Sequence, residues 1–476
     1  MLRFGFKTIV ALLLAPVFAP VFAEGPAKPT DAVLDTERPR FEALARRIWE
    51  TPELALNETR SSAALADALE KEGFQVKRGV GDLPTAFIAT AGSGEPVIAV
   101  LAEYDALPAL SQAAAESKKH VLADGTPGQG CAHNLLGTAS VAGAIAANRV
   151  RIQQKLPGTI QVFGTPGEEV FIGKVFMVRD GVFAKTDAVL TWHPDDQNRV
   201  VNRTRLAAAA VDVEFLGKSA HASASPWLGR SSLDALVLFD HAMALMREHL
   251  RPTARIHRVV KDGGAQANII PDYTRGQYWV RDASIEGVKS MLDRLRKAAD
   301  GAATATETKA KVTALFEARD PVPNDALGKV MQRELERIGA PAFDDADLTF
   351  AKAMQRELAF EPAGLSTTVM PYAPRTGGTA SSDIGEVSAV VPLAELGVVT
   401  RPLGTAAHHW AQTSCAAHPL GMKGMLVAAK VLAASVVDLL QDPAAVKAVK
   451  EEFAKTMKGK SYVSPLTPDA KPHVFQ

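Results

Sequence analysis

The sequence predicts an α/β protein in which a domain with a mostly parallel central sheet is interrupted by a smaller, inserted α+β unit. Three observations support this fold class. The chain has 476 residues, which is long for one domain. Strand-like and helix-like segments alternate from about Arg38 to His193, which is the βαβ pattern of a largely parallel sheet. The pattern changes between residues 205 and 317, after which helices resume.

Short apolar runs and amphipathic stretches predict the elements of the larger domain. Its predicted strands each lead into polar residues, and sites in open α/β sheets form outside the carboxyl ends of strands. We therefore expect these polar side chains to meet in one crevice. The predicted helices lie at 41–51, 61–72, 135–147, 325–338 and 422–440, the predicted strands lie at 97–101, 160–163 and 188–192, and the polar residues that follow the strands are Glu103, Asp105, Glu168, Glu169 and His193.

The middle of the chain predicts a compact unit of its own. Strand-like and helix-like segments occur twice in succession, so we expect a four-stranded sheet backed by two helices. Ser232 is the predicted N-cap of the first of these helices. The predicted strands lie at 208–216 and 275–281, and the predicted helices lie at 232–250 and 285–299. The predicted bounds are 205–317 for this insert, 32–204 and 318–455 for the larger domain, and 456–476 for a loosely packed C-terminal tail.

The first 23 residues have the layout of a cleavable secretory signal. Two basic residues precede an apolar stretch that Pro16 and Pro20 interrupt, and a small-residue cleavage motif ends at Ala23. The stretch is shorter than the roughly 20 residues that span a bilayer. We therefore expect removal of 1–23, a periplasmic or secreted mature protein without stable membrane insertion, and a linker at 25–31.

Charge and cysteine content narrow the classes of partner. The chain has 53 acidic and 53 basic residues, so its net charge favours neither nucleic acid nor an anionic membrane. A small-molecule partner is expected instead. Export would allow a disulfide between Cys131 and Cys415, because exported chains meet an oxidising environment. The neighbours of Cys131 favour a metal site over that pairing.

Cysteine and histidine residues stand at the ends of predicted elements. Cys131 and His133 lie on the turn before a small-residue helix, and a thiolate and a neutral imidazole are good zinc ligands. The alternative is a buried thiol beside a helix-capping histidine. His193 ends an apolar strand just before a proline, which makes a purely structural core histidine less favoured. Of the adjacent pair His408 and His409, only one is expected to be a ligand.

Acidic residues follow the same strands. Glu168 and Glu169 come after a predicted tight turn, and two adjacent carboxylates point in different directions, which suits one metal ligand and one proton carrier. The alternative is an ordinary solvated loop. Asp105 either holds a ligating histidine in its correct tautomer or caps a helix that begins at Leu107.

Taken together, the motifs resemble the aminoacylase and carboxypeptidase family of dinuclear metallohydrolases, over nearly all of the mature chain. Its Cys-x-His form is similar to the amidohydrolase branch that cleaves N-acyl amino acids, and segments 86–89, 176–183 and 423–426 resemble the p-aminobenzoyl-glutamate hydrolases. Ala132 departs from a usual glycine, and Asn134 from an aspartate common in the branch. The motifs are 101–108, 130–134, 167–169, 191–194 and 404–408.

The resemblance implies a zinc-peptidase-like catalytic domain with an inserted lid and dimerisation domain, and it implies a role for each site residue. Glu168 matches the general base and Asp105 the acid that orients a ligand. His221 matches a lid histidine that stabilises the oxyanion, often across a dimer interface. Asn268 and Arg281 match the groups that hold the substrate carboxylate. The residues that match ligands of two divalent ions, zinc or manganese, are Cys131, His133, Glu169, His193 and His408, with the thiolate as the bridge.

These roles imply metal-dependent hydrolysis of the amide bond of an N-acyl amino acid, with p-aminobenzoyl-glutamate as the first candidate. A dipeptidase or general aminoacylase is the alternative within the same chemistry. An exported binding protein without catalysis is the alternative of another class, and it predicts loss of the base or of a ligand, whereas all are present. The resemblance also implies a homodimer through the lid and allows for a companion subunit.

Overall fold

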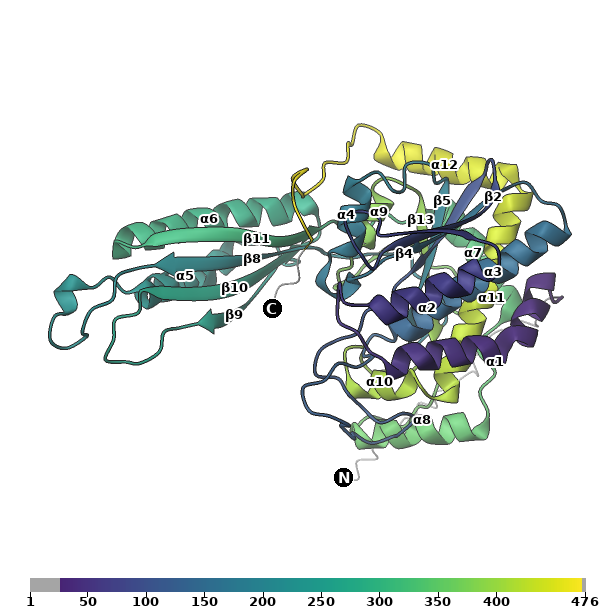
Figure 1. The fold of residues 1–476 in the computed structure, drawn as a ribbon, viewed down its shortest axis with the longest axis horizontal. Coiled ribbons are helices and arrows are strands. Elements are labelled where there is room, and N and C mark those ends of the chain that lie inside the picture. Colours follow the sequence, from purple (N-terminus) through teal and green to yellow (C-terminus); the bar gives the residue numbers. More distant parts are fainter. Residues whose placement is uncertain (1–25, 473–476) are drawn as a thin grey trace, which may run out of the picture.

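The structure is a computed structural model that describes residues 26–472. The predicted signal at 1–23 lies outside the described residues. Figure 1 shows a larger unit, in which helices cover a central sheet, and a narrower unit that projects from it. The narrower unit comes from the middle of the chain, and the segments on both sides of it belong to the larger unit. The mixed α/β fold with a separate antiparallel sheet agrees with the predicted fold class.

The central sheet has four parallel strands in its middle and antiparallel strands at its edges. The predicted strands of the larger domain are confirmed as β3, β4 and β5. One detail was wrong: β5 continues to Asp195, so His193 lies within the strand and pairs with Gly397. Across the sheet the order is β1 (Gln75–Arg78), β2 (Phe87–Ser93), β4 (Gly158–Gly164), β3 (Val97–Ala102), β5 (Ala188–Asp195), β13 (Leu393–Val399) and β6 (Arg199–Val200).

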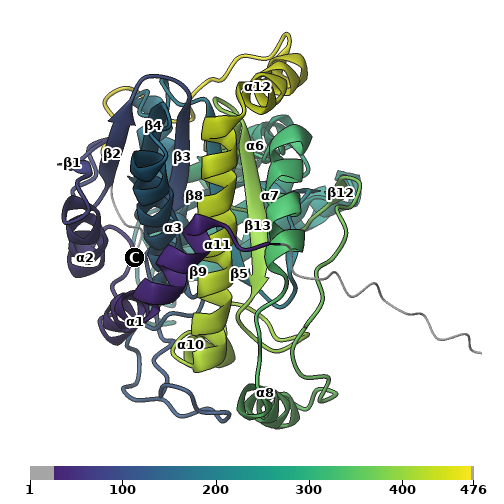
Figure 2. The ribbon, with the colours of Figure 1, turned by 90° about the vertical axis from the view of Figure 1, so that its right-hand side faces the viewer.

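Helices bury both faces of this sheet, which explains why its strands are apolar runs rather than alternating sequences. Ile98 and Val100 of β3 face one helical layer, whereas Ala99 and Leu101 face the other. Figure 2 shows α3 and α11 side by side in front of the sheet. The first layer contains α1 (Pro29–Glu50), α2 (Thr59–Glu70), α3 (His133–Gln153), α7 (Asp325–Ile338), α11 (Pro419–Gln441) and α12 (Pro443–Met457), and the second contains α4 (Gly173–Arg179) and α9 (Ile384–Ser388).

The long helix α11 and the N-terminal helix α1 both pack in the core of the larger unit. Within residues 26–472, α11 alone is long and apolar enough to cross a membrane, but 78% of its apolar window is buried in the core, so it is a core helix here. The linker predicted at 25–31 was wrong, because α1 begins at Pro29. The buried Asp31 forms an ion pair of 2.7 Å with Arg337 of α7, which attaches this end of the helix to the core.

The inserted unit is a four-stranded antiparallel sheet with two helices on one face, as predicted. Ser231, not Ser232, caps α5, because its side chain accepts a hydrogen bond from the backbone N–H of Asp234. The edge strand β9 is largely exposed. The sheet order is β11 (Lys309–Ala318), β8 (Ala207–Leu216), β10 (Tyr273–Asp282) and β9 (Arg255–Asp262), and the helices are α5 (Ser232–Met246) and α6 (Ile285–Thr306).

The C-terminal segment packs on the larger unit, and short elements complete both units. Up to residue 472 the tail is not loose, because Tyr462 packs beneath the Arg319 guanidinium at 5.2 Å and the Ala470 carbonyl accepts a hydrogen bond from Arg179. The remaining elements are α8 (Asp345–Glu357), α10 (Trp410–Cys415), the short strands β7 (Arg203–Thr204) and β12 (Thr376–Gly377), and the 3-10 turns Glu168–Val170, Pro226–Leu228 and Arg247–His249.

Candidate metal centre

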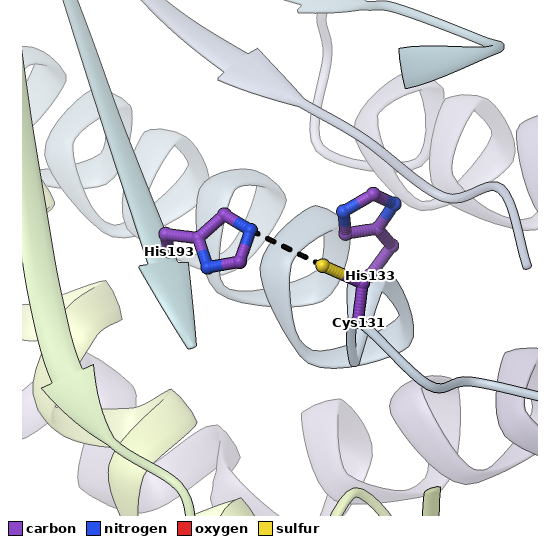
Figure 3. Close-up of side chains that lie close together, drawn as sticks. All are labelled: Cys131, His133 and His193. Atoms are coloured by element: carbon purple, nitrogen blue, oxygen red, sulfur yellow. Dashed lines mark hydrogen bonds between the residues drawn. The ribbon is translucent and has the colours of Figure 1, made fainter. Parts of the chain in front are cut away.

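The turn before α3 supplies a thiol and an imidazole to one point. Ala132 adopts a left-handed conformation with φ of 59°, which explains why glycine would be usual there. Figure 3 shows Cys131, His133 and His193 gathered together, with 3.3 Å between Sγ of Cys131 and Nε2 of His193. Cys131 is not bonded to Cys415, which lies in a separate apolar cluster beside Met354.

The ligand atoms form two groups that share one sulfur atom. Those of Cys131, His133 and His193 all lie within 4.8 Å of one another, and so do those of Cys131, Glu169 and His408. The five residues predicted as metal ligands are therefore brought together. A thiolate common to both groups has the position that a bridge between two ions requires.

Hydrogen bonds orient the imidazoles. Nδ1 of His193 donates to the carbonyl of Pro194 at 2.9 Å, and Nδ1 of His133 faces Oδ1 of Asp105 at 2.9 Å. Since a carbonyl and a carboxylate accept, both rings present Nε2 toward the shared point. The other oxygen of Asp105 accepts the backbone N–H of Glu169 at 2.9 Å. Asp105 thus orients two of the candidate ligands and does not cap a helix.

The two adjacent histidines have different positions. Nε2 of His408 lies 3.2 Å from Oε2 of Glu169, and its backbone N–H donates to the carbonyl of Gly130 at 2.8 Å. His409 is the N-cap of α10, where its ring accepts the N–H of Ala411. Only His408 therefore faces the site.

The residues fit divalent cations. Nε2 of His133 and Oε1 of Glu169 are buried and make no hydrogen bond within residues 26–472, which leaves both atoms available to an ion. Burial raises the pKa of the Cys131 thiol, and burial also raises the pKa of Glu169 to about 7. Both shifts have the sign expected where buried anionic ligands lack positive charge. Bound cations would supply that charge.

Glu168 occupies a position of its own. Gly167, with φ of 65°, starts the 3-10 turn that directs Glu168 and Glu169 to different places. The Glu168 carboxylate lies within 4.8 Å of the Glu103 carboxylate and the His133 imidazole, outside the two groups that share Cys131. Burial, together with the charges of Glu103 and Glu169, raises the pKa of Glu168 well above its usual value. A buried carboxyl beside the ligands suits a proton carrier.

A cavity of about 530 Å³ opens onto these residues. It is lined by both glutamates, by Cys131 and by residues of the inserted unit, which include Trp279 and Arg281. The guanidinium of Arg281 donates to Oγ of Ser381 at 2.9 Å and so connects the two units. The volume is within the range of small-molecule sites.

His221 and Asn268 are not brought to this cavity by the chain described here, residues 26–472. On β10, Arg281 pairs with Ala208 near the larger unit, whereas Tyr273 pairs with Leu216 at the other end. The loop that contains His221 follows β8 at this far end, and the loop that contains Asn268 leads into β10 at the same end (Figure 1). A ten-residue strand spans about 30 Å, so neither side chain reaches the metal ligands within one chain.

Comparisons with known proteins agree with this geometry. Residues 204–307 match the peptidase dimerisation domain of the M20 family. The chain is 36% identical over 469 residues to the B subunit of p-aminobenzoyl-glutamate hydrolase from Escherichia coli, which covers 93% of this chain and 98% of that protein. It is 31% identical over 441 residues to Xaa-Arg dipeptidase of Mus musculus, covering 88% and 90% of the two chains.

The chain belongs to the M20 peptidase family. Solved structures with the same fold include a dinuclear metal-binding M20 peptidase from Bacillus subtilis, with TM-score 0.57, 18% identity, and coverage of 86% of this chain and 99% of that one. Another is the aminobenzoyl-glutamate utilization protein from Klebsiella pneumoniae, with TM-score 0.60, 17% identity, and coverage of 86% and 98%. This M20 chain is a metal-dependent hydrolase of amide bonds, and its inserted unit carries the dimerisation domain.

Sequence reasoning missed a buried ion network behind the M20 site. The Lys174 ammonium is fully buried and lies 2.8 Å from Glu103 and 2.7 Å from Asp383. Against the effect of burial, Lys174 lowers the pKa of Glu103, whose other oxygen lies 3.4 Å from Nε2 of His133. The signal available in the sequence was one lysine in the otherwise apolar start of α4, which by itself indicates no partner.

We expect Lys174→Met to destabilise the metal-free protein by about 3 to 5 kcal/mol, because it leaves the buried carboxylates of Glu103 and Asp383 without a counter-charge. The measurement is the midpoint of urea unfolding at neutral pH. Lys447→Met is the control, since Lys447 is exposed and is expected to change stability by less than about 0.5 kcal/mol. Equal midpoints for the two variants would contradict a stabilising role for the network.

Proposed function

We propose that this chain hydrolyses p-aminobenzoyl-glutamate to p-aminobenzoate and glutamate, with zinc or manganese as its two metal ions. The observation that carries this proposal is a single cavity lined by Glu168, Arg281, aromatic side chains and all the candidate ligands except His133, which is buried directly behind Cys131 and His193. The 36% identity to the Escherichia coli protein over nearly the whole of both chains favours this substrate. A thiolate, imidazole and carboxylate set suits either metal.

The proposed roles follow from the chemistry of each group. Two bound ions would lower the pKa of a water and polarise the amide carbonyl. Glu168 takes the proton of the attacking water and returns it to the leaving nitrogen. Arg281 holds the α-carboxylate of the amino acid with paired hydrogen bonds. Trp279 and Phe171, which line the cavity and meet edge to face with centroids 5.9 Å apart, offer an aromatic wall for the aminobenzoyl ring.

We further propose that the site is completed in a homodimer. His221 would stabilise the oxyanion, and Asn268 would contact the carboxylate, in the cavity of the other protomer. The match to a dimerisation domain and the exposed edge strand β9 support assembly through the lid, since an unpaired edge is available for pairing. Similarity to a protein that is named as one of the subunits of a hydrolase favours a search for a companion subunit.

Domain bounds and location remain as proposed from the sequence. We propose a catalytic domain at 32–204 with 318–455, to which the start of α1 at Pro29 adds three residues, a lid at 205–317, and a C-terminal segment at 456–476. The signal-like composition of 1–23 supports export of the mature chain to the periplasm or beyond.

Glutamate release tests the proposed function. Mature protein loaded with zinc or manganese is incubated with p-aminobenzoyl-glutamate, alongside a chelated sample and a chelated sample to which metal is restored. We expect release in the loaded sample, loss with chelator, and recovery with metal. Chelator-resistant release would contradict the metal-dependent mechanism, and no release from loaded protein would contradict the proposed substrate.

A further inference from the structure

The cavity beside the metal centre has an excess of positive charge on its walls. Five arginines line it. Three of them have carboxylate partners: Arg199 pairs with Asp195 at 2.8 Å, Arg401 lies 3.6 Å from the same carboxyl group, and Arg205 pairs with Glu395. These three therefore have carboxylate partners within the protein, although Arg199 and Arg401 share one of them. The other two are Arg203 and Arg281.

Within the described part of the chain, neither Arg203 nor Arg281 forms an ion pair. Arg281 is held by Ser381 and lies over the Trp279 ring at 5.3 Å, and burial lowers its pKa without an opposing carboxylate. Arg203 lies on β7, whose pairing with β12 fixes its backbone while its side chain stays exposed on the cavity wall. The cavity therefore presents two guanidinium groups with no internal counter-charge.

The acids that line the same cavity do not cancel this excess. Asp195 and Glu395 are already paired with arginines. Glu169 belongs to a ligand group and Glu168 lies directly beside the ligands, where bound cations would offset their charge, and in the described part of the chain neither forms an ion pair with Arg203 or Arg281. A ligand that satisfies both remaining guanidinium groups must carry two anionic groups. Arginine forks favour planar carboxylates in particular.

We infer that the site selects N-acyl amino acids with an acidic side chain, and that Arg203 binds the side-chain carboxylate while Arg281 binds the α-carboxylate. This inference rests on the proposed function, which gives Arg281 its role. The inference also distinguishes this chain from one of its relatives. The name Xaa-Arg dipeptidase implies a substrate with a cationic arginine side chain. In the cavity described here, the two unpaired arginines would repel that side chain.

The test compares substrates that differ only in the side chain. Initial rates are measured with the p-aminobenzoyl derivatives of glutamate, glutamine and arginine, because glutamine is the neutral match for glutamate. We expect the wild-type kcat/KM for the glutamate derivative to exceed that for glutamine by about 10- to 100-fold, the range of one hydrogen bond to a charged group. The arginine derivative should be the poorest. Equal values for glutamate and glutamine would overturn the inference.

Variants assign the preference to one residue. Arg203→Gln should reduce the ratio of kcat/KM for the glutamate derivative to that for the glutamine derivative at least about 10-fold, mainly through a higher KM for the glutamate derivative. Arg203→Glu should reverse the preference. Arg47→Gln is the control, because Arg47 is an exposed arginine at the end of α1, outside the cavity lining. An unchanged ratio in both Arg203 variants would exclude Arg203.

A binding measurement removes the dependence on turnover. With Glu168→Gln as the background, the dissociation constant of p-aminobenzoyl-glutamate should rise at least about 10-fold on adding Arg203→Gln, and that of p-aminobenzoyl-glutamine should change little. The results also distinguish an error in the proposed substrate from an error in the proposed selectivity. If another N-acyl glutamate or aspartate is cleaved in preference to the matching glutamine or asparagine compound, only the aminobenzoyl group is rejected. If p-aminobenzoyl-glutamate and p-aminobenzoyl-glutamine are cleaved equally well, only the acidic selectivity is rejected.

Discussion

Glu168→Gln is expected to reduce kcat by about 10²- to 10⁴-fold while the protein keeps its bound metal, because the substitution removes the proton carrier and leaves every ligand in place. Glutamine has nearly the same shape as glutamate but cannot accept and return a proton. The Glu168 carboxylate lies outside the two groups that share Cys131, which is why metal content should survive. The measurements are turnover with saturating substrate and metal per chain after dialysis.

The control for Glu168→Gln is Glu357→Gln, which makes the same chemical change at an exposed position near the end of α8. It should keep full activity. Retained turnover in the Glu168 variant would show that another group carries the proton, and Glu103, within 4.8 Å of the Glu168 carboxylate, would be the next to test. Loss of metal together with turnover would instead indicate that Glu168 is a ligand.

The residues that meet at the candidate metal centre could be predicted from the sequence, because the signal for each lies in a short segment of the chain. Apolar runs that are buried on both faces of a sheet can be recognised without coordinates, and each run ended close to the polar residues it delivers. His193 shows the limit of this reasoning. It stands inside β5, and its direction depends on the hydrogen bond to the Pro194 carbonyl, which no spacing reveals.

What the sequence could not predict depends on pairs that are distant in the chain. Lys174 and Asp383 are 209 residues apart, and only the packing of α4 against α9 joins them. Arg203 is a second example. Its role can be inferred only from the structure, in which β7 pairs with β12, the neighbouring arginines pair with carboxylates, and Arg203 has no ion-pair partner within residues 26–472. Motif spacing carries no information about which charges remain uncompensated.

Cys131→Ser is expected to lower bound metal below two ions per chain and to reduce activity by at least about 100-fold, since even loss of a group that only orients a ligand commonly costs 10- to 100-fold. Sγ of Cys131 is the one atom common to both ligand groups. A serine hydroxyl at this place does not ionise readily and is a poor bridge between cations. Metal per chain, measured after dialysis against a weak chelator, tests this expectation directly.

Cys415→Ser separates the metal role from a structural one. Cys415 is buried beside Met354 in an apolar cluster, so its serine variant should lose some stability and keep its metal, while Cys131→Ser should lose metal. A disulfide between the two cysteines predicts the opposite relation: both variants would lose stability to the same extent, and neither would lose metal. Because the two substitutions are chemically identical, a difference in metal content between them can come only from where each sulfur lies.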